Sequence, residues 1–297
     1  MGRYPRGWRE MVGCMRRLLL VLLMMGMVLP ELVSAGPIMR KEDIDRFLKT
    51  TTYVVLDNNP MSEWNMKIRD AVQQSWTITP YKFINDTEFE QMRGDADKSF
   101  LVRMKVRFPE DKVKSFYNFM VVALGAGTQK AGDMPDVCSI PLGYEPVDQT
   151  SWAYKLTSFV RFAQNHIRLL HEQPNLISNN PFEHYNKNIA DLGGREIWVV
   201  ERDLAPDIRS ASKIRESYKG VVRIVSEDEI EQAIAEKNQN VVFLHKVGPE
   251  GTRMQARIYK VLVGAGDDRI YYFDYHTMTK SNGDGFLRKD FKRIGNR

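Results

Sequence analysis

The chain has 297 residues, of which 43% are apolar, so its length allows one large globular domain or two smaller ones and its composition excludes a disordered protein. Its net charge of +5 depends on the first 35 residues, which contain five Arg and two Glu. The remainder has 38 basic and 36 acidic residues, a net charge of +2 that gives no support to nucleic-acid binding.

The N-terminal segment, residues 1–35, has the pattern of a cleavable export signal. Two arginines precede an apolar run at 18–29, and Val33 and Ala35 occupy the −3 and −1 positions of a cleavage site. A run of this length is too short to span a bilayer. Cys14 precedes the run, which disfavours a lipid anchor. We therefore expect an exported protein, periplasmic or extracellular, with no transmembrane segment in its mature part.

The cysteine content restricts the chemistry of the mature chain. Cys138 is its single cysteine, which excludes an internal disulfide and a zinc site of several cysteines. Because Cys138 lies in an alternating apolar stretch, we expect it to be a small buried hydrophobic residue. No cofactor or metal site is predicted.

Residues 36–180 are predicted to form a first unit of alternating strands and helices. β-branched runs bounded by turn residues predict strands, and apolar residues at helical spacing predict helices. In chain order, we expect a strand at 51–57, a helix at 62–76, a strand at 81–84, a short helix after Asn85, strands at 98–108, 115–125 and 136–142, and a long helix from Trp152.

Residues 181–297 repeat this order. The stretch from Pro174 to Gly194 has the Pro, Asn and Gly content of a linker, and we place the boundary near residue 180. The second unit is predicted to contain a strand at 195–203, a helix at 210–220, a strand at 221–226, a helix after Ser226, strands at 240–247, 256–264 and 269–278, and a closing helix at 283–294.

Two kinds of marker set the register of this repeat: capping boxes and Gly-Ala-Gly turns. They are Asn85 and Glu88 against Ser226 and Glu229, 141 positions later, and Gly125 and Gly127 against Gly264 and Gly266, 139 positions later. Similar offsets with one element order indicate a tandem duplication. We predict an α/β protein of two βαβαβββα units, each a mixed sheet with helices packed on it, because βαβ starts give parallel neighbours and tight turns give antiparallel ones.

Three stretches carry a resemblance to known proteins: 52–60 (TYVVLDNNP), 75–84 (SWTITPYKFI) and 285–294 (GFLRKDFKRI). With the tandem unit, they make the mature chain resemble an uncharacterised family of exported proteins from Bacteroidota. The order of elements is also similar to the N-terminal domain of TolB-like envelope proteins. The resemblance implies a role in the cell envelope and no particular activity.

Two motifs raise the question of chemistry. The stretch 125–132 (GAGTQKAG) combines glycines with a lysine, but it lacks the GK[ST] ending of a phosphate loop, so a hairpin turn is favoured. Alternation places Tyr272, Asp274 and His276 on one face of a strand. Asp274 and His276 are the candidate catalytic pair, because an Asp oriented toward a His can serve a general base or a metal ion. The alternative is a solvated sheet face.

The long helix from Trp152 has a wide apolar stripe that covers its own sheet or forms a seam with the second half or with another chain. We expect a binding or scaffold module of the envelope, acting on a protein partner or a small ligand. The alternatives are an enzyme or a small-ligand receptor, each using a cleft between the two units. The oligomeric state is left open.

Overall fold

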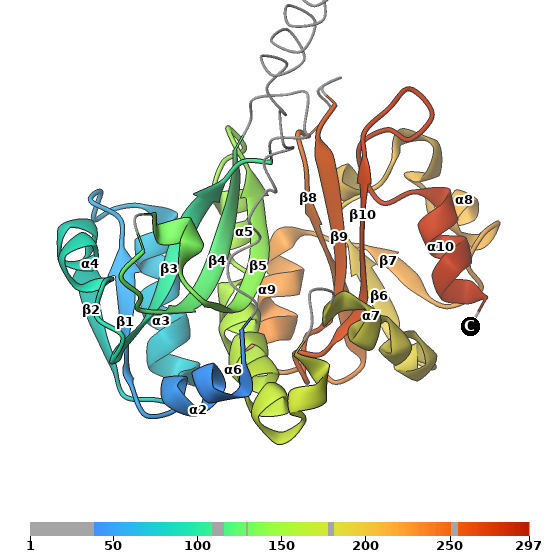
Figure 1. Ribbon diagram of the computed structural model, residues 1–297. Helices are drawn as coiled ribbons and strands as arrows, with labels where there is room; N and C mark the ends of the chain where they lie inside the picture. The colour runs from blue at the N-terminus through green and yellow to red at the C-terminus, as the bar shows by residue number, and fades with distance from the viewer. Residues whose placement is uncertain (1–38, 109–115, 129, 178–180, 251–254, 297) are drawn as a thin grey trace, which may run out of the picture. The chain divides into compact units, whose positions relative to one another are not determined.

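The described part of the chain has the predicted α/β architecture, with two five-stranded mixed sheets and helices packed on them (Figure 1). These residues belong to one compact unit. The predicted boundary near residue 180 lies in the part of the chain between β5, the last strand of the first sheet, and β6, the first strand of the second. The computed structural model describes residues 39–108, 116–128, 130–177, 181–250 and 255–296.

The first sheet has the strand order β2-β1-β3-β4-β5, in which β1 is parallel to both of its neighbours and β3, β4 and β5 are antiparallel. Its strands are β1 (Thr51–Leu56), β2 (Tyr81–Asn85), β3 (Lys98–Val106), β4 (Tyr117–Leu124) and β5 (Asp136–Tyr144). Its helices are α2 (Lys41–Phe47), α3 (Glu63–Ser75), α4 (Asp86–Met92), η1 (Ala131–Asp133), α5 (Thr150–Ala153) and α6 (Leu156–Glu172).

The second sheet repeats this topology with the order β7-β6-β8-β9-β10. Its strands are β6 (Glu196–Val199), β7 (Val222–Ile224), β8 (Val241–Val247), β9 (Arg257–Gly264) and β10 (Ile270–Thr277). Its helices are η4 (Glu201–Asp203), η5 (Pro206–Ile208), α8 (Ala211–Arg215), α9 (Glu227–Ala235) and α10 (Arg288–Gly295).

Both predicted capping boxes are present at equivalent positions. The Asn85 side chain accepts from Glu88 N at 3.0 Å, and Asn85 N donates to the Glu88 carboxylate at 2.9 Å. Ser226 Oγ accepts from Glu229 N at 3.2 Å, and Ser226 N donates to the Glu229 carboxylate at 2.8 Å. These bonds satisfy backbone N–H groups that have no partner inside α4 and α9.

The positive φ that glycine allows in hairpin turns does not explain the glycine markers. Neither Gly125 nor Gly264 has a positive φ, and in the β9–β10 turn that conformation belongs to Asp268, with φ 55°. A Cβ on Gly125 would lie 1.8 Å from the Asp95 carbonyl oxygen, so glycine is required there for space. The β4–β5 connection is also longer than the predicted tight turn and contains η1.

The two units share one apolar core. Trp64 of α3, Phe159 of α6 and Phe243 of β8 belong to the same buried cluster, which joins one face of the first sheet to one face of the second. Helices α8 and α10 pack on the opposite face of the second sheet, where Ile214 and Phe291 are buried. Helix α6 therefore covers its own sheet and also forms the seam that the sequence analysis treated as an alternative.

Two segments differ from the prediction. Residues Lys41–Phe47, where no element was predicted, form α2, whose Ile44 and Phe47 are fully buried. The predicted linker contains ordered structure because its polar side chains bond to a strand edge: Asn186 exchanges two hydrogen bonds with the backbone of Phe273, at 2.7 and 2.9 Å. The helices of this segment are η2 (Pro174–Leu176), α7 (Pro181–Asn186) and η3 (Lys187–Leu192).

Candidate functional site

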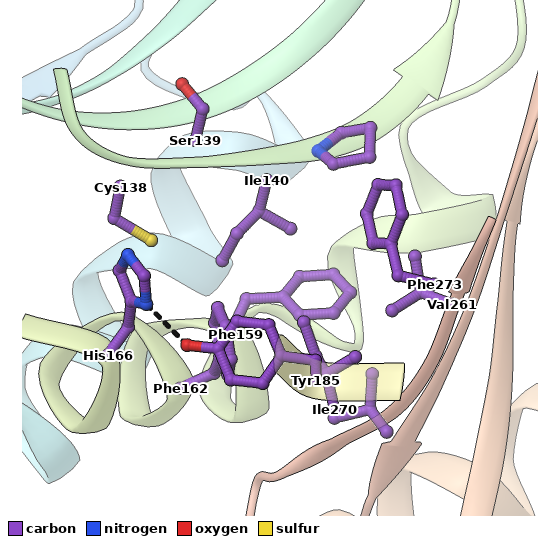
Figure 2. Close-up of a pocket in the computed structure, with 12 residues that line it drawn as sticks. Cys138, Ser139, Ile140, Phe159, Phe162, His166, Tyr185, Val261, Ile270 and Phe273 are labelled. Atoms are coloured by element: carbon purple, nitrogen blue, oxygen red, sulfur yellow. Dashed lines mark hydrogen bonds between the residues drawn. The ribbon is translucent and has the colours of Figure 1, made fainter. Parts of the chain in front are cut away.

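An apolar cavity of about 50 Å³ lies where α6, α7 and strands of both sheets meet (Figure 2). Its wall is contributed by five elements that are far apart in the sequence. Strand β5 contributes Cys138, Ser139, Ile140 and Pro141, α6 contributes Phe159, Phe162 and His166, α7 contributes Tyr185, β9 contributes Val261 and Val263, and β10 contributes Ile270 and Phe273.

The periodicity of each element explains how these side chains reach the cavity. Successive residues of a strand point to opposite faces, so Cys138 and Ile140 face the shared core while the Ser139 hydroxyl points away and donates to Asp136 (Figure 2). On α6, Phe159, Phe162 and His166 follow the three- and four-residue steps of one helix face. Local patterns therefore determine which side chains of each element face the core, while the packing of the five elements brings these side chains together.

The one polar pair in the cavity is His166 and Tyr185. His166 Nδ1 shares a hydrogen bond with the Tyr185 hydroxyl, and the His166 ring stacks on Phe162 with ring centroids 5.8 Å apart (Figure 2). Burial lowers the pKa of His166 to about 4, and the neighbouring His184 adds to this shift. At neutral pH the cavity is therefore uncharged.

The Cys138 thiol also faces the cavity, and the structure confirms that it is buried. Burial raises the pKa of Cys138 well above its ordinary value, and the nearby Asp136 carboxylate acts in the same direction. Because the thiolate is the nucleophilic form of cysteine, this thiol is unsuited to nucleophilic catalysis. The chemistry of the cavity is that of apolar binding.

A second hollow of about 300 Å³ adjoins the cavity and shares three of its residues, Phe162, His166 and Tyr185. Its remaining wall is more polar and comes from α6, α7, η3 and the β9–β10 turn. The residues found only in this outer hollow are Asn165, Leu169, His184, Asn188, Asp268 and Arg269. The shared His166–Tyr185 pair thus stands between the inner cavity and an outer hollow whose wall also includes charged and amide side chains.

No family model, curated protein or solved structure matches this chain. Its function therefore has to be inferred from its own side chains. In the described part of the chain, no group of three or more His, Cys, Asp or Glu residues is placed to hold a metal ion. In the same residues, no helix is long and apolar enough to cross a membrane.

The predicted catalytic pair lies elsewhere, on the face of β10 that α10 partly covers. The Asp274 carboxylate accepts from the Tyr272 hydroxyl at 3.1 Å, from Arg293 at 3.2 Å and from Lys260 at 3.5 Å. Asp274 is thus one member of an ion-pair network that also holds Asp290, 2.7 Å from Lys260. This network attaches α10 to its sheet.

His276 is held by a separate contact. Its Nε2 lies 2.9 Å from the Gly283 carbonyl oxygen, and its Nδ1 is buried without a hydrogen bond in the described part of the chain. Burial lowers the pKa of His276. No hydrogen bond joins Asp274 to His276 in the described part of the chain. Helix α10 covers their face of the strand only in part, since the Asp274 side chain is 29% exposed, so the face is neither the site of a catalytic pair nor fully solvated.

Sequence reasoning did not find the cavity. Two signals were present: His166 interrupts the apolar stripe of α6, and Tyr185 is an aromatic residue in a segment rich in Asn and Pro. Neither signal identifies a site alone, because a histidine on an apolar helix face is commonly a buried core residue. Only the packing of α7 against α6 brings the two rings together.

Proposed function

We propose that this protein is a binding module that takes up a small, mainly apolar molecule at the cavity between its two sheets. The observation that carries the proposal is that the inner apolar cavity and the outer hollow are adjacent and share Phe162, His166 and Tyr185 as a common wall. Small-molecule sites are typically concave and apolar, with a few polar groups that fix orientation. The position of the cavity between strands of the two sheets supports this proposal.

The two volumes restrict the ligand. An engineered apolar cavity of about 150 Å³ holds benzene. The inner cavity, at about 50 Å³, is smaller, so it accepts only the end of an alkyl chain unless its walls move. The outer hollow, at about 300 Å³, has room for the remainder. A short alkyl chain that enters by one end fits these dimensions.

The His166–Tyr185 pair restricts the polar part of the ligand. When the Tyr185 hydroxyl donates to Nδ1, Nε2 of the neutral His166 ring carries the proton and can donate in turn. A hydroxyl or carbonyl oxygen is therefore the complementary group. A free ammonium is excluded from the inner cavity by its cost of desolvation. We infer a neutral alkyl alcohol or ketone as the ligand class.

The proposal is tested by titrating the protein with n-alkanols from butanol to octanol and following methyl resonances by NMR. Ile140 and Ile270 line the cavity, whereas Ile214 and Ile294 lie in the core on the far face of the second sheet. We expect saturable shifts at the first pair only, strengthening with chain length by about 0.8 kcal/mol for each buried CH₂. Shifts of equal size at both pairs would contradict the proposal.

A cavity-filling variant provides the matched control. Val263→Ile adds one methyl group to the cavity wall, while Val54→Ile adds it to the shared core on β1, which β3 and β4 separate from the cavity-lining strand β5. Binding is expected to weaken in Val263→Ile and to persist in Val54→Ile. Equal binding by both variants would place the ligand elsewhere.

We also propose that the protein acts in the cell envelope after export. The support is the arrangement of two arginines, an apolar run and small residues in 1–35, a segment that lies outside the described residues. Expression of the full chain followed by mass spectrometry of the mature protein is expected to give Gly36 as the first residue. Retention of residues 1–35 in the mature protein would refute the assignment of this segment as a cleavable export signal.

A further inference from the structure

The Lys260 amine is buried between two carboxylates under helix α10. Its Nζ lies 2.7 Å from Asp290 Oδ1 and 3.5 Å from Asp274 Oδ2. The side chains of Lys260 and Asp290 are 0% and 2% exposed, so water has almost no access to this pair. Three elements, β9, β10 and α10, thus bring one amine and two carboxyl groups together in the interior.

The Tyr272 hydroxyl joins the two carboxyl groups. It lies 2.9 Å from Asp290 Oδ1 and 3.1 Å from Asp274 Oδ2. Burial raises the pKa of Tyr272, and the carboxylates of Asp290 and Asp274 act in the same direction, so the hydroxyl keeps its proton at neutral pH. Because a hydroxyl group both donates and accepts, Tyr272 can pass a proton from one carboxyl group to the other.

The surroundings of this group are apolar. The Tyr272 ring lies edge-to-face with Phe286, and Phe286 with Phe291, at centroid distances of 5.8 and 4.8 Å. Leu262, two positions after Lys260 on β9, belongs to the same buried cluster. In such surroundings an ammonium and a carboxylate lose the solvation that favours their charged forms, which brings the neutral amine and carboxylic acid within reach.

The two oxygens of Asp290 have different partners. Oδ2 accepts from the Leu287 backbone N–H at 2.8 Å, in the cap of α10. Oδ1 contacts both the Lys260 amine and the Tyr272 hydroxyl. The backbone therefore holds one oxygen, while the other lies between a nucleophile and a proton donor. A nucleophile held next to a carboxyl group reacts at a high effective concentration.

We propose that Lys260 and Asp290 become joined by an intramolecular isopeptide bond. Asp274 takes a proton from the Lys260 ammonium, and the freed electron pair of Nζ forms a bond to Cγ of Asp290. The bond from Cγ to Oδ1 breaks, and Oδ1 leaves as water. Of the three ammonium protons, one stays on the amide nitrogen, and two reach Oδ1 through Asp274 and Tyr272. The reaction requires no oxidant, reductant or further reactant.

The product fits the site that the ion pair leaves. A neutral amide replaces two buried charges, so the cost of their desolvation is removed. Oδ2 becomes the amide oxygen and still accepts from the Leu287 N–H, which preserves the cap of α10. Asp274 keeps Arg293 as a partner, 3.2 Å away, and its 29% exposed side chain marks the route by which water leaves. The bond ties α10 covalently to β9.

The test is mass spectrometry of the purified full chain after unfolding and tryptic digestion. We expect an intact mass lower by one water molecule than the sum of the residues. Loss of water elsewhere in the chain gives the same mass, so the position is read from the digest. The linked protein should give one branched peptide, in which residues 258–269 are joined to residues 290–292. Separate peptides ending at Lys260 and beginning at Asp290, with no branched species, would overturn the proposal.

A variant tests the role of the second carboxyl group. Asp274→Asn keeps the Lys260–Asp290 pair but removes the proton acceptor, so linkage should slow by roughly a hundredfold. Circular dichroism establishes that the variant is folded. Linkage at an unchanged rate in folded Asp274→Asn would contradict the mechanism.

The matched control is a second buried ion pair on the same sheet. Lys246 Nζ lies 3.0 Å from Asp284, and the Lys246 side chain is 1% exposed. Among the described residues, no second carboxylate lies within 4 Å of Lys246. This pair should stay unlinked in the same digest. A branched peptide joining Lys246 to Asp284 would show that a buried ion pair is sufficient and would remove the role given to Asp274.

Discussion

Arg161 Nε donates to Asp268 Oδ2 at 2.8 Å and so joins α6 of the first unit to the β9–β10 turn of the second. Ser158 donates to the other oxygen of Asp268 at 2.9 Å. The same arginine donates to the backbone carbonyls of Ile234 and Ala265, at 3.1 and 3.2 Å. With side-chain exposures of 11% for Arg161 and 7% for Asp268, this is a buried ion pair with additional partners.

Breaking this pair is expected to destabilise the protein. Asp268→Asn keeps a residue type that tolerates the positive φ of this position but leaves Arg161 uncompensated. Removing one partner of a buried ion pair typically costs about 3–5 kcal/mol, and we expect the lower end because Arg161 keeps its carbonyl partners. Urea unfolding monitored by circular dichroism measures the change.

An exposed ion pair serves as the control for Asp268→Asn. Lys213 and Glu216 lie 3.2 Å apart with exposures of 55% and 50%, so Lys213→Ala should change the free energy of unfolding by less than about 1 kcal/mol. If the two variants unfold at the same urea concentration, the Arg161–Asp268 pair does not hold the two units together.

The free energy of unfolding is expected to decrease as the pH is lowered, because of His166. Its pKa is lowered from 6.5 to about 4 by burial, so the unfolded chain binds a proton that the folded one does not as the pH drops below 6.5. The loss develops between pH 6.5 and 4, and this shift corresponds to about 3 kcal/mol. Burial also lowers the pKa of His245, which adds to the loss. Unfolding free energies from pH 7 to pH 4 test this.

The double variant His166→Phe with Tyr185→Phe isolates the contribution of His166. It removes the imidazole and leaves no unpaired Tyr185 hydroxyl, while a ring remains to stack on Phe162. The pH-dependent loss should become smaller by about 3 kcal/mol. An unaltered slope in the double variant would contradict the assignment.

The two capping boxes should contribute similar stabilities. Asn85→Ala and Ser226→Ala each remove a side chain that accepts from the third backbone N–H of a helix. Each should lower the free energy of unfolding by about 0.5–2 kcal/mol. Thr87→Ala, at an exposed position inside α4, is the control and should have a smaller effect. Unchanged denaturation midpoints in both cap variants would refute their role.

Gly125 and Gly127 provide a matched pair for the effect of space on a turn. A Cβ at Gly125 would overlap the Asp95 carbonyl, whereas nothing lies within 4 Å of one at Gly127. Gly125→Ala should therefore cost about 1–3 kcal/mol through forced backbone shifts. Gly127→Ala should be neutral, or stabilising by up to about 1 kcal/mol through the unfolded chain. Thermal unfolding of both variants measures the difference. Equal midpoints would show that the space beside the Asp95 carbonyl does not require glycine at position 125.

The order of strands and helices could be predicted from the sequence because it depends on local patterns. The alternating apolar residues of β5, the stripe of α6 and the caps at Asn85 and Ser226 are set by neighbours within a few positions. Their repetition at nearly constant offsets gave the tandem architecture before any contact was known. Helix α2 was missed because its few apolar residues, Ile44 and Phe47, are buried only by tertiary packing.

The candidate sites depend on contacts that no local pattern specifies. Cys138, His166 and Tyr185 become neighbours because α7 folds back on α6, and Asn186 fixes that position through the backbone of β10. Asp274 and His276 share a strand face, as alternation requires, but α10 decides that this face is partly covered. Sequence periodicity thus determined which side of each element is apolar, and only tertiary packing decided which apolar sides meet, because the apolar attraction that drives burial has no directional preference.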